Sequence, residues 1–279
     1  MTPVRNVAAS APLAVAPNGG RRTRADHPAL PIGPAELART AAECLEAGAA
    51  MIHAHVRDGA DGHLLDADAY RAAIAAIRAE VGERMVIQIT SEALGIYSPQ
   101  EQMAVVRAVK PQAASLALRE ILPETADETA FGDFLRWMKA ERVAPQFIVY
   151  EPEEAVRLDA LRRRGIVPFE EPPVLYVLGR YTTGQTSAPR DLLPFLAAGQ
   201  PVFRRFMVCA FGALEAACTI TGGLLGGGLR VGFENNLLLP DGNPAASNAE
   251  LIATVRRGLE AAGIGAMSGE ELAQDWANL

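Results

Sequence analysis

Residues 47–58 read Ala-Gly-Ala-Ala-Met-Ile-His-Ala-His-Val-Arg-Asp, and this stretch joins the end of a predicted helix to a predicted buried strand. An amphipathic helix is expected over 34–47. It begins at Pro34, has apolar residues at every fourth position and ends before Gly48. The apolar run that follows predicts a strand over 51–56. A helix, a glycine stop and an apolar strand in this order are typical of parallel α/β proteins.

The same alternation continues along the whole chain. Apolar segments that can form strands are 13–16, 51–56, 85–90, 113–118, 146–150, 174–178, 206–210 and 229–234. Amphipathic segments that can form helices are 34–47, 66–81, 99–109, 127–141, 152–164, 190–198, 212–221 and 248–262. Eight such units without a break in composition predict an α/β fold, a single-domain (β/α)8 TIM barrel over 13–279 after a loose N-terminal leader over 1–12. A doubly wound open sheet is the alternative, because periodicity does not distinguish a closed sheet from an open one.

Composition narrows the class of protein. The formal net charge of −7 over 279 residues argues against a nucleic-acid partner. The three cysteines lie in apolar stretches and form no Cys-x-x-Cys pair, which predicts reduced core residues in a cytoplasmic protein. No apolar run reaches the roughly 18 residues that a membrane span needs, so we expect no membrane partner. The glycine-rich stretch 222–228 is expected to be the loop before the last strand.

Two histidines on the second predicted strand give the sharpest functional signal. Alternation places Met51, His53 and His55 on one face, and the apolar residues between them suit the helix layer. Both imidazoles are therefore predicted to point into the barrel mouth, with Cα atoms about 6–7 Å apart, near enough to share one metal ion. The alternative is a pair of core histidines that hydrogen-bond to backbone or carboxylate groups.

The last predicted strand offers a third ligand. Arg230, Gly232 and Glu234 share one parity, and charged side chains are more favourable in a solvated mouth than against the helix layer. Glu234 completes a His2Glu set with water in the fourth position, a known catalytic zinc arrangement. The alternative is that Glu234 only pairs with Arg230.

Other strand ends carry polar residues. Thr90 ends the third predicted strand, Ser115 lies in the fourth, and Glu151 closes the fifth, where it can instead cap the following helix. Asn18 and the basic run that begins at Arg21 follow the first strand and so lie over the mouth. We expect them to bind an anionic group, a carboxylate or the phosphates of a nucleotide-like cofactor, although a charge run is often only a solvated surface.

Two blocks of residues give the chain a resemblance to the β-keto acid cleavage enzyme family of zinc-dependent barrels. The first block is His-Pro-Ala-Leu-Pro at 27–31 with the stretch 47–58, and the second is Arg-Val-Gly-Phe-Glu-Asn-Asn-Leu at 230–237 with Ser-Asn-Ala-Glu-Leu at 247–251. The likeness runs from about residue 13 to the end of the chain. It implies an enzyme that converts a β-keto acid and acetyl-CoA into acetoacetate and a new acyl-CoA.

The resemblance also implies roles for residues. His53, His55 and Glu234 would bind Zn²⁺, and Arg230 would work with a neighbouring acid. Thr90 and Ser115 fall where the family has hydroxyl residues that hydrogen-bond the substrate. We also expect a homo-oligomer, a dimer or a tetramer.

The chain departs from the family pattern at two positions. Asn235 stands where well-known members have an aspartate, and an amide cannot accept a proton at neutral pH. Glu151 or a metal-bound hydroxide are the alternatives for the general base. Arg21 falls near the place where an amine-recognising member has an acidic residue, which predicts a neutral or anionic acyl group.

Two other functions stay open at this point. A zinc-dependent hydrolase or class II-type aldolase would keep the metal and need no acetyl-CoA. A non-catalytic metal- or ligand-binding barrel would explain Asn235 as a sign of lost activity. Barrels of one fold differ widely in chemistry, so the fold alone does not decide among these functions.

Overall fold

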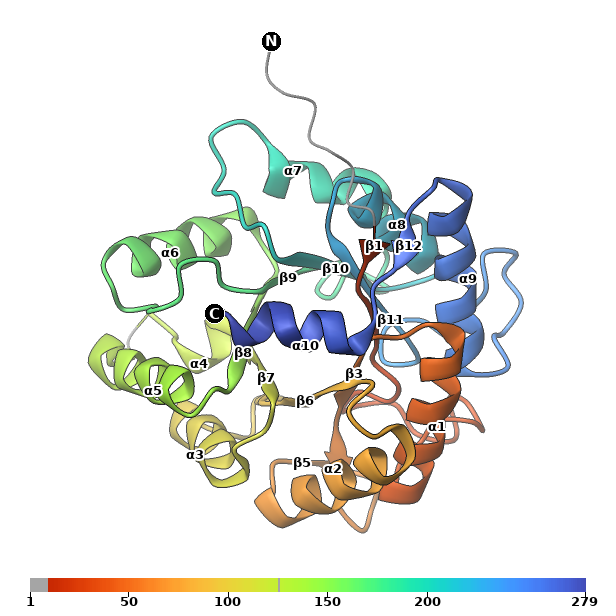
Figure 1. Ribbon diagram of the computed structural model, residues 1–279, viewed down its shortest axis with the longest axis horizontal. Helices are drawn as coiled ribbons and strands as arrows, with labels where there is room; N and C mark the ends of the chain where they lie inside the picture. The colour runs from red at the N-terminus through yellow and green to blue at the C-terminus, as the bar shows by residue number, and fades with distance from the viewer. Residues whose placement is uncertain (1–9, 125) are drawn as a thin grey trace.

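The computed structural model describes residues 10–124 and 126–279, and these form a closed barrel of parallel strands (Figure 1). The barrel strands are β2 (Leu13–Val15), β3 (Met51–Ala54), β6 (Val86–Thr90), β7 (Ala113–Ala117), β8 (Ala144–Val149), β9 (Val174–Leu178), β10 (Phe206–Ala210) and β11 (Gly228–Val231). They pair in sequence order, and β11 pairs with β2 to close the sheet. The predicted (β/α)8 barrel is confirmed, and the open-sheet alternative is wrong.

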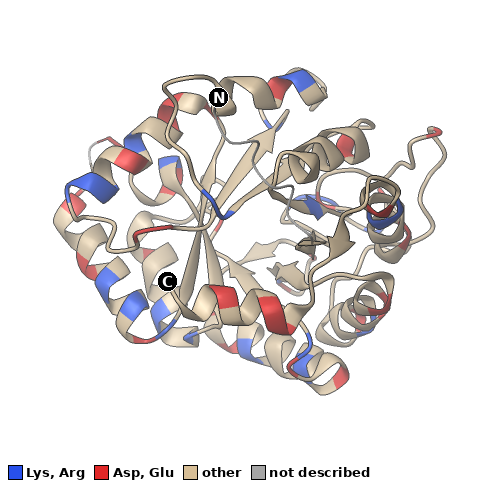
Figure 2. Ribbon diagram, turned by 45° about the horizontal axis from the view of Figure 1, so that its top comes forward, with Lys and Arg blue, Asp and Glu red and all other residues tan. Residues whose placement is uncertain are grey.

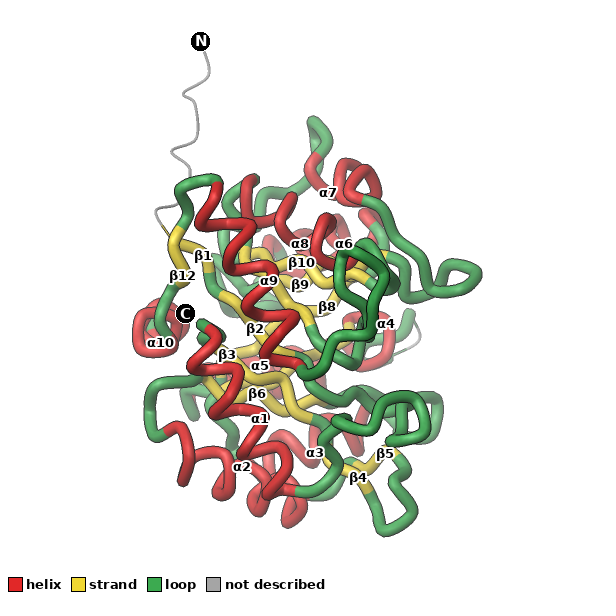
Figure 3. The backbone as a smooth tube through the Cα atoms, turned by 90° about the vertical axis from the view of Figure 1, so that its right-hand side faces the viewer, coloured by secondary structure: helices red, strands yellow, loops and turns green. Residues whose placement is uncertain are grey.

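Most helices lie around the outside of the barrel, and one lies across its N-terminal end (Figures 1 and 3). They are α1 (Pro34–Ala47), α2 (Ala67–Val81), α3 (Pro99–Val109), α4 (Leu118–Ile121), α5 (Glu128–Ala140), α6 (Pro152–Arg163), η1 (Pro189–Leu192), α7 (Leu193–Leu196), α8 (Glu215–Leu224), α9 (Asn248–Ala261) and α10 (Gly269–Ala277). The ends of α1 and α3 agree with the sequence prediction, because a proline begins each helix. The helix expected over 190–198 is instead a 3-10 turn followed by one α-helical turn, and Pro194 removes a backbone donor within it.

The sequence predicted that the glycine-rich stretch 222–228 is a loop, but part of this stretch is helical. Gly222 and Gly223 belong to α8. A Cβ on Gly222 would lie 2.5 Å from Val208 Cγ2, and one on Gly223 would lie 2.7 Å from Leu259 Cδ2. Glycine is therefore needed here because α8 packs closely against β10 and α9, and not because the chain turns.

Several short elements had no clear signal in the sequence. They are α4, α10, the antiparallel hairpin of β4 (Val56–Arg57) and β5 (His63–Leu64), and the parallel pair β1 (Ser10–Ala11) and β12 (Gly265–Ala266). Residues 1–9 of the expected leader lie outside the described residues. The next two residues of that segment form β1.

The barrel wall separates two apolar layers. Ile52 and Ala54 of β3 face the helices, whereas Met51 belongs to the layer inside the barrel. Leu272 and Trp276 of α10 join this inner layer, and α10 crosses the N-terminal end of the barrel in Figure 1. Charged residues lie mostly on the outer helices and loops (Figure 2). Side chains that carry chemistry are therefore to be sought at the open, C-terminal end.

Among the described residues, no helix combines the length and the apolar character that a bilayer crossing requires.

Candidate metal centre and active site

The end of β3 delivers two histidines to the mouth of the barrel. His53 is a residue of β3, and His55 follows the strand by one residue. Both side chains are buried and lie on the same side as Met51, as the alternation of the strand requires. Their Nε2 atoms lie 3.1 Å apart. Two ring nitrogens at this separation can bind one ion.

Glu234 reaches the same point from a turn, and not from the strand predicted over 229–234. β11 ends at Val231 because Gly232 takes a φ of +145°, a value that disfavours other residues. A Cβ at Gly232 would also lie 2.3 Å from the carbonyl oxygen of Ala16. The Glu234 backbone N–H donates to the same oxygen at 3.0 Å, which ties the turn to the end of β2.

The three side chains form a triangle of the size that a metal ion needs. Glu234 Oε2 lies 3.4 Å from His55 Nε2 and 3.6 Å from His53 Nε2. A tetrahedral ion with bonds of about 2.0–2.2 Å holds its ligand atoms about 3.3–3.6 Å apart. Glu234 Oε2 is buried and accepts no hydrogen bond from the described residues. The donor set, the spacing and this unpaired oxygen all fit a divalent ion.

The protonation states also suit a metal ion. Burial lowers the pKa of His53 to about 3, and the charge of Arg230 acts in the same direction, so this imidazole is neutral at pH 7. Burial alone would raise the pKa of Glu234, but Arg230 and then His55 and His53 hold that pKa well below its usual range. Metal binding requires neutral imidazole and ionised carboxylate, so neither ligand has to lose a proton at pH 7.

A chain of buried amides lies beneath the histidine pair. Gln88 Oε1 accepts a hydrogen bond from His53 Nδ1 at 2.7 Å, which leaves the Nε2 lone pair directed at the site. Gln88 Nε2 in turn donates to Gln146 Oε1 at 3.0 Å, and Gln146 Nε2 lies 3.2 Å from the Met207 sulfur. The tautomer of His53 is thus fixed by the barrel interior.

Asn18, which we expected to contact substrate, makes its hydrogen bonds to the backbone of a histidine. Its amide donates to the carbonyl oxygen of His55 at 3.0 Å, and its Oδ1 accepts from the His55 N–H at 3.3 Å. Asn18 also lines a cavity beside the site. Its contacts therefore support a positioning role for this residue.

Glu215 of α8 holds in place the turn that carries Glu234, because it bonds to residues on both sides of Glu234. Its carboxyl oxygens accept hydrogen bonds from the Gly232 N–H at 3.0 Å and from Asn236 Nδ2 at 3.3 Å. Burial raises the pKa of Glu215 to about 8, against the opposing effect of these two donors.

Two further side chains hold the same turn. Asn248 Oδ1 accepts from the Phe233 N–H at 2.9 Å. Arg22, from the basic run after β2, donates to the Phe233 carbonyl oxygen at 2.6 Å and lies 3.4 Å from that of Asn235. The run therefore serves the Glu234 turn at this position, a contact that the sequence did not suggest.

The cavity above the three candidate ligands, which we call the inner cavity, contains both predicted hydroxyl residues. It is lined by His53, His55, Thr90, Glu92, Ser115, Ala117, Ile148, Tyr150, Val177, Arg180, Phe211, Arg230 and Glu234. Ser115 Oγ lies 3.5 Å from Thr90 Oγ1 across the β6–β7 pair. Arg230 donates to Glu234 Oε1 at 3.2 Å, and its Nε and Nη1 have no partner in the part of the chain that the structure describes.

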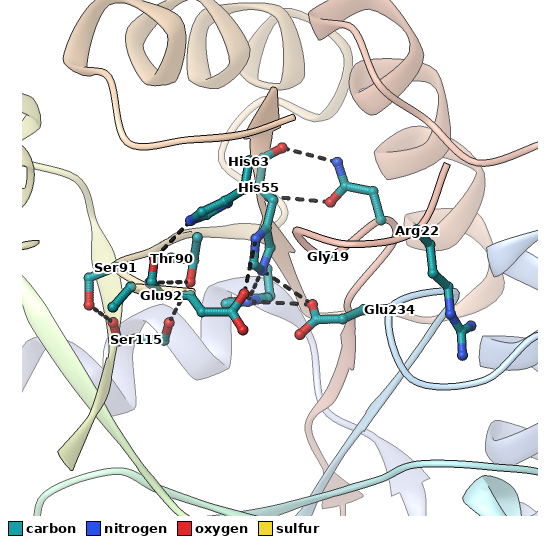
Figure 4. Close-up of polar contacts among 12 residues, drawn as sticks. Gly19, Arg22, His55, His63, Thr90, Ser91, Glu92, Ser115 and Glu234 are labelled. Atoms are coloured by element: carbon teal, nitrogen blue, oxygen red, sulfur yellow. Dashed lines mark hydrogen bonds and ion pairs between the residues drawn. The ribbon is translucent and has the colours of Figure 1, made fainter. Parts of the chain in front are cut away.

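A second, outer cavity adjoins the first. It is lined by Asn18, Gly19, Gly20, Arg21, Arg22, Glu92, Arg180, Gln185, Phe211 and Glu234. Arg21 is exposed here, at the mouth where the sequence predicted it. The carboxylates of Glu92 and Glu234 both face the His55 ring (Figure 4), and Glu92 Oε2 lies 3.8 Å from His55 Nδ1.

Two of the predicted residues do not line either cavity. Glu151 is exposed and occupies the N-cap position of α6, where its side chain makes no capping hydrogen bond. Asn235 is fully buried, and its side-chain amide has no hydrogen-bond partner among the described residues. Neither residue is positioned to take a proton from a molecule in the inner cavity.

Sequence reasoning missed Glu92 and Arg180, which line both cavities. Each comes two residues after the end of a barrel strand, Thr90 of β6 and Leu178 of β9. A rule that looks for charged residues just past every strand end would have found both, because barrel sites form from these loops.

Known proteins resemble this chain along most of its length. The family model of the beta-keto acid cleavage enzyme matches residues 11–274. A 3-keto-5-aminohexanoate cleavage enzyme from Acetoanaerobium sticklandii is 28% identical over 86% of this chain and 88% of its own. A 3-dehydrocarnitine:acetyl-CoA trimethylamine transferase from Rhizobium meliloti is also 28% identical, over 87% of this chain and 88% of its own.

A solved structure shares the fold. The ternary complex of ObcA with a C4-CoA adduct and oxalate aligns with a TM-score of 0.71 at 18% identity, over 90% of this chain and 68% of the other. Because the family model covers nearly the whole barrel, this chain belongs to the beta-keto acid cleavage enzyme family and is an enzyme that acts on carbon–carbon bonds.

Proposed function

We propose that this enzyme converts a β-keto acid and acetyl-CoA into acetoacetate and a new acyl-CoA, with Zn²⁺ held by His53, His55 and Glu234. The observation that carries the proposal is the triangle of 3.1, 3.4 and 3.6 Å between one carboxylate oxygen and two imidazole nitrogens. The relative from Rhizobium meliloti has acetyl-CoA in its name, which supports acetyl-CoA as the second substrate.

The bond changes of the proposed reaction balance without an oxidant or reductant. The carbon between the keto and carboxyl groups loses a proton and forms a bond to the acetyl carbon, and CoA leaves as a thiolate. The thiolate then forms a bond to the original keto carbon, and the bond from that carbon to its former neighbour breaks. Acetoacetate leaves after it regains the proton, and the remaining acyl group leaves as its CoA thioester.

The residues of the inner cavity suit this chemistry. When bound, zinc polarises the keto group and stabilises the negative charge that develops on its oxygen. Arg230 lines the cavity, its Nε and Nη1 have no partner among the described residues, and its guanidinium adds a second positive charge near that oxygen. Thr90 and Ser115 present hydroxyl groups that orient the substrate.

The proton acceptor is not Asn235, because an amide accepts no proton at neutral pH. Glu151 does not line the inner cavity. Among the described residues, the carboxylates that do line it are Glu234 and Glu92.

The charges of the two cavities favour a neutral or anionic acyl group. Their arginines are Arg21, Arg22, Arg180 and Arg230, and their carboxylates are Glu92 and Glu234. Arginines outnumber carboxylates here even before a divalent ion is added, so an ammonium group on the substrate would be repelled.

The test is a panel of β-keto acids assayed with the zinc-loaded enzyme, with and without acetyl-CoA. We expect acetoacetate and a new acyl-CoA only when acetyl-CoA is present. Turnover that does not need acetyl-CoA would instead identify a hydrolase or a class II-type aldolase. Bound zinc with no turnover of any β-keto acid would favour a non-catalytic barrel.

The matched control for this assay is a pair of histidine variants. His53→Ala removes a proposed ligand, whereas His63→Ala removes a buried histidine whose ring lies 5.5 Å from that of His55 and which is outside the triangle. Activity should be lost in the first variant and kept in the second. Light scattering of the same preparations would test the expected homo-oligomer.

A further inference from the structure

The inner and outer cavities meet at an ion pair. Glu92 and Arg180 line both cavities, together with Phe211 and Glu234. Arg180 Nη2 donates to Glu92 Oε1 at 3.3 Å, and the two side chains are only 13% and 18% exposed. A molecule that extends from the candidate metal centre toward the outer cavity must therefore pass this pair.

The guanidinium of Arg180 has hydrogen-bonding capacity to spare. The hydrogen bond to Glu92 is the only one that its side chain makes to the described residues, and a guanidinium has five N–H donors. The planar group of the arginine can therefore bind a second carboxylate beside the first and donate two parallel hydrogen bonds to it.

The position of this guanidinium is well fixed. Its central carbon lies 5.1 Å from the ring centre of Phe211 and 5.9 Å from that of Tyr181. The loop that carries it is closed by Thr182, whose hydroxyl accepts from the Thr186 N–H at 2.9 Å. A charged group held in place before binding loses little freedom when a ligand arrives.

We propose that Arg180 binds a carboxylate at the far end of the acyl group, so that the enzyme prefers β-keto dicarboxylic acids. This inference rests on the proposed function. The β-keto acid end occupies the inner cavity at His53, His55 and Glu234, and the distal carboxylate lies at the border of the two cavities. Arg21 adds positive charge at the mouth, where it attracts the dianion.

Turnover tests the proposal with two acids of equal chain length. We expect wild-type kcat/KM to be higher for 3-oxoadipate than for 3-oxohexanoate. Arg180→Gln should lower kcat/KM for 3-oxoadipate by about 10- to 100-fold, the usual effect of a lost hydrogen bond to a charged group, and should change that for 3-oxohexanoate by less than about threefold. Equal losses for both acids would mean a general structural role and would overturn the proposal.

Three variants make the comparison specific. Arg190→Gln removes an arginine that is 85% exposed and outside both cavities, so selectivity should not change. Arg180→Lys keeps the charge without the planar group and should keep part of the preference. The double variant Arg180→Gln/Glu92→Gln keeps the net charge of the pair, and it should still lose the preference if Arg180 itself binds the carboxylate.

A binding measurement keeps the inference testable if no β-keto acid is turned over. Calorimetry with adipate and hexanoate requires no reaction. Wild type should bind adipate more tightly, and Arg180→Gln should remove the difference between the two acids. Equal binding by wild type would reject the role of Arg180, while turnover of 3-oxohexanoate with acetyl-CoA would leave the proposed function intact.

Discussion

The two sides of the candidate metal centre are built in different ways. His53 and His55 come from the end of a regular strand, so the alternation of the backbone decides where they point. Glu234 comes from a turn, and its position depends on a glycine with a φ of +145° and on hydrogen bonds that the turn donates to distant side chains.

The difference separates two sources of precision. A strand positions its side chains through a local pattern that tolerates many sequences. A turn requires tertiary contacts, and Glu215 and Arg22 supply them from segments far apart in the chain. Damage to the strand side should therefore cost metal affinity alone, whereas damage to the turn side should cost stability as well.

The largest effect is expected from the loss of a ligand on the strand side. His53→Ala should weaken zinc binding by roughly a thousandfold, a quarter to two-fifths of the free energy typical of a zinc site, and should leave unfolding largely unchanged. Competition with a chromogenic chelator measures the affinity, with His63→Ala as control. Unchanged zinc binding in His53→Ala would remove this histidine from the ligand set.

Gly232→Ala should break the turn side. A strained φ and the contact with the Ala16 oxygen should together lower the free energy of unfolding by about 3 kcal/mol and weaken zinc binding in the same protein. Gly242→Ala is the control, because Gly242 also has a positive φ of +87° but no atom near its Cβ position. Urea unfolding separates the two variants, and equal losses would mean that the close contact is unimportant.

Glu215→Gln should change how the stability of the turn side depends on pH. Burial raises the pKa of Glu215 from its usual 4.5 to about 8, so the folded protein holds this proton more tightly than the unfolded chain does. The resulting stability, of the order of a few kcal/mol, is full below pH 4.5 and is lost as the pH rises to about 8. Urea unfolding across this range should give a flatter profile in Glu215→Gln than in wild type or in Glu260→Gln, a change at an exposed residue of α9.

The smallest effect is expected beneath the histidine pair. Gln88→Leu removes the acceptor that orients His53 and should weaken zinc binding by about 10- to 100-fold. Gln102→Leu replaces another buried glutamine, one whose side chain contacts no polar partner among the described residues, and should leave zinc binding unchanged. Equal affinities in the two variants would show that His53 needs no orienting partner.

The strand side could be predicted from the sequence and the turn side only in part. His53 and His55 followed from alternation alone, and Pro34 with Gly48 fixed the ends of α1. Glu234 was placed at the mouth for a wrong reason, because nothing in the local pattern reveals that the strand ends before Gly232.

Contacts between distant segments explain what the sequence could not supply. Arg22 reaches the carbonyl of Phe233 across 211 positions of the chain, and no periodicity reports such a pairing. The role expected for Glu151 likewise depended on where its side chain points after packing. The Glu92–Arg180 pair joins the ends of β6 and β9, which are neighbours neither in sequence nor in the sheet.

Helix α10 has a consequence for the order of events in the proposed reaction. It closes the N-terminal end of the barrel, and Gln88, Gln146 and Met207 fill the space between this end and His53. The inner cavity is therefore closed on the side of α10, and we expect both substrates to enter from the C-terminal side of the barrel. If both substrates enter from the same side, the small keto acid should bind before the bulky thioester. The acyl-CoA should then leave before acetoacetate. Product-inhibition patterns should therefore show ordered kinetics.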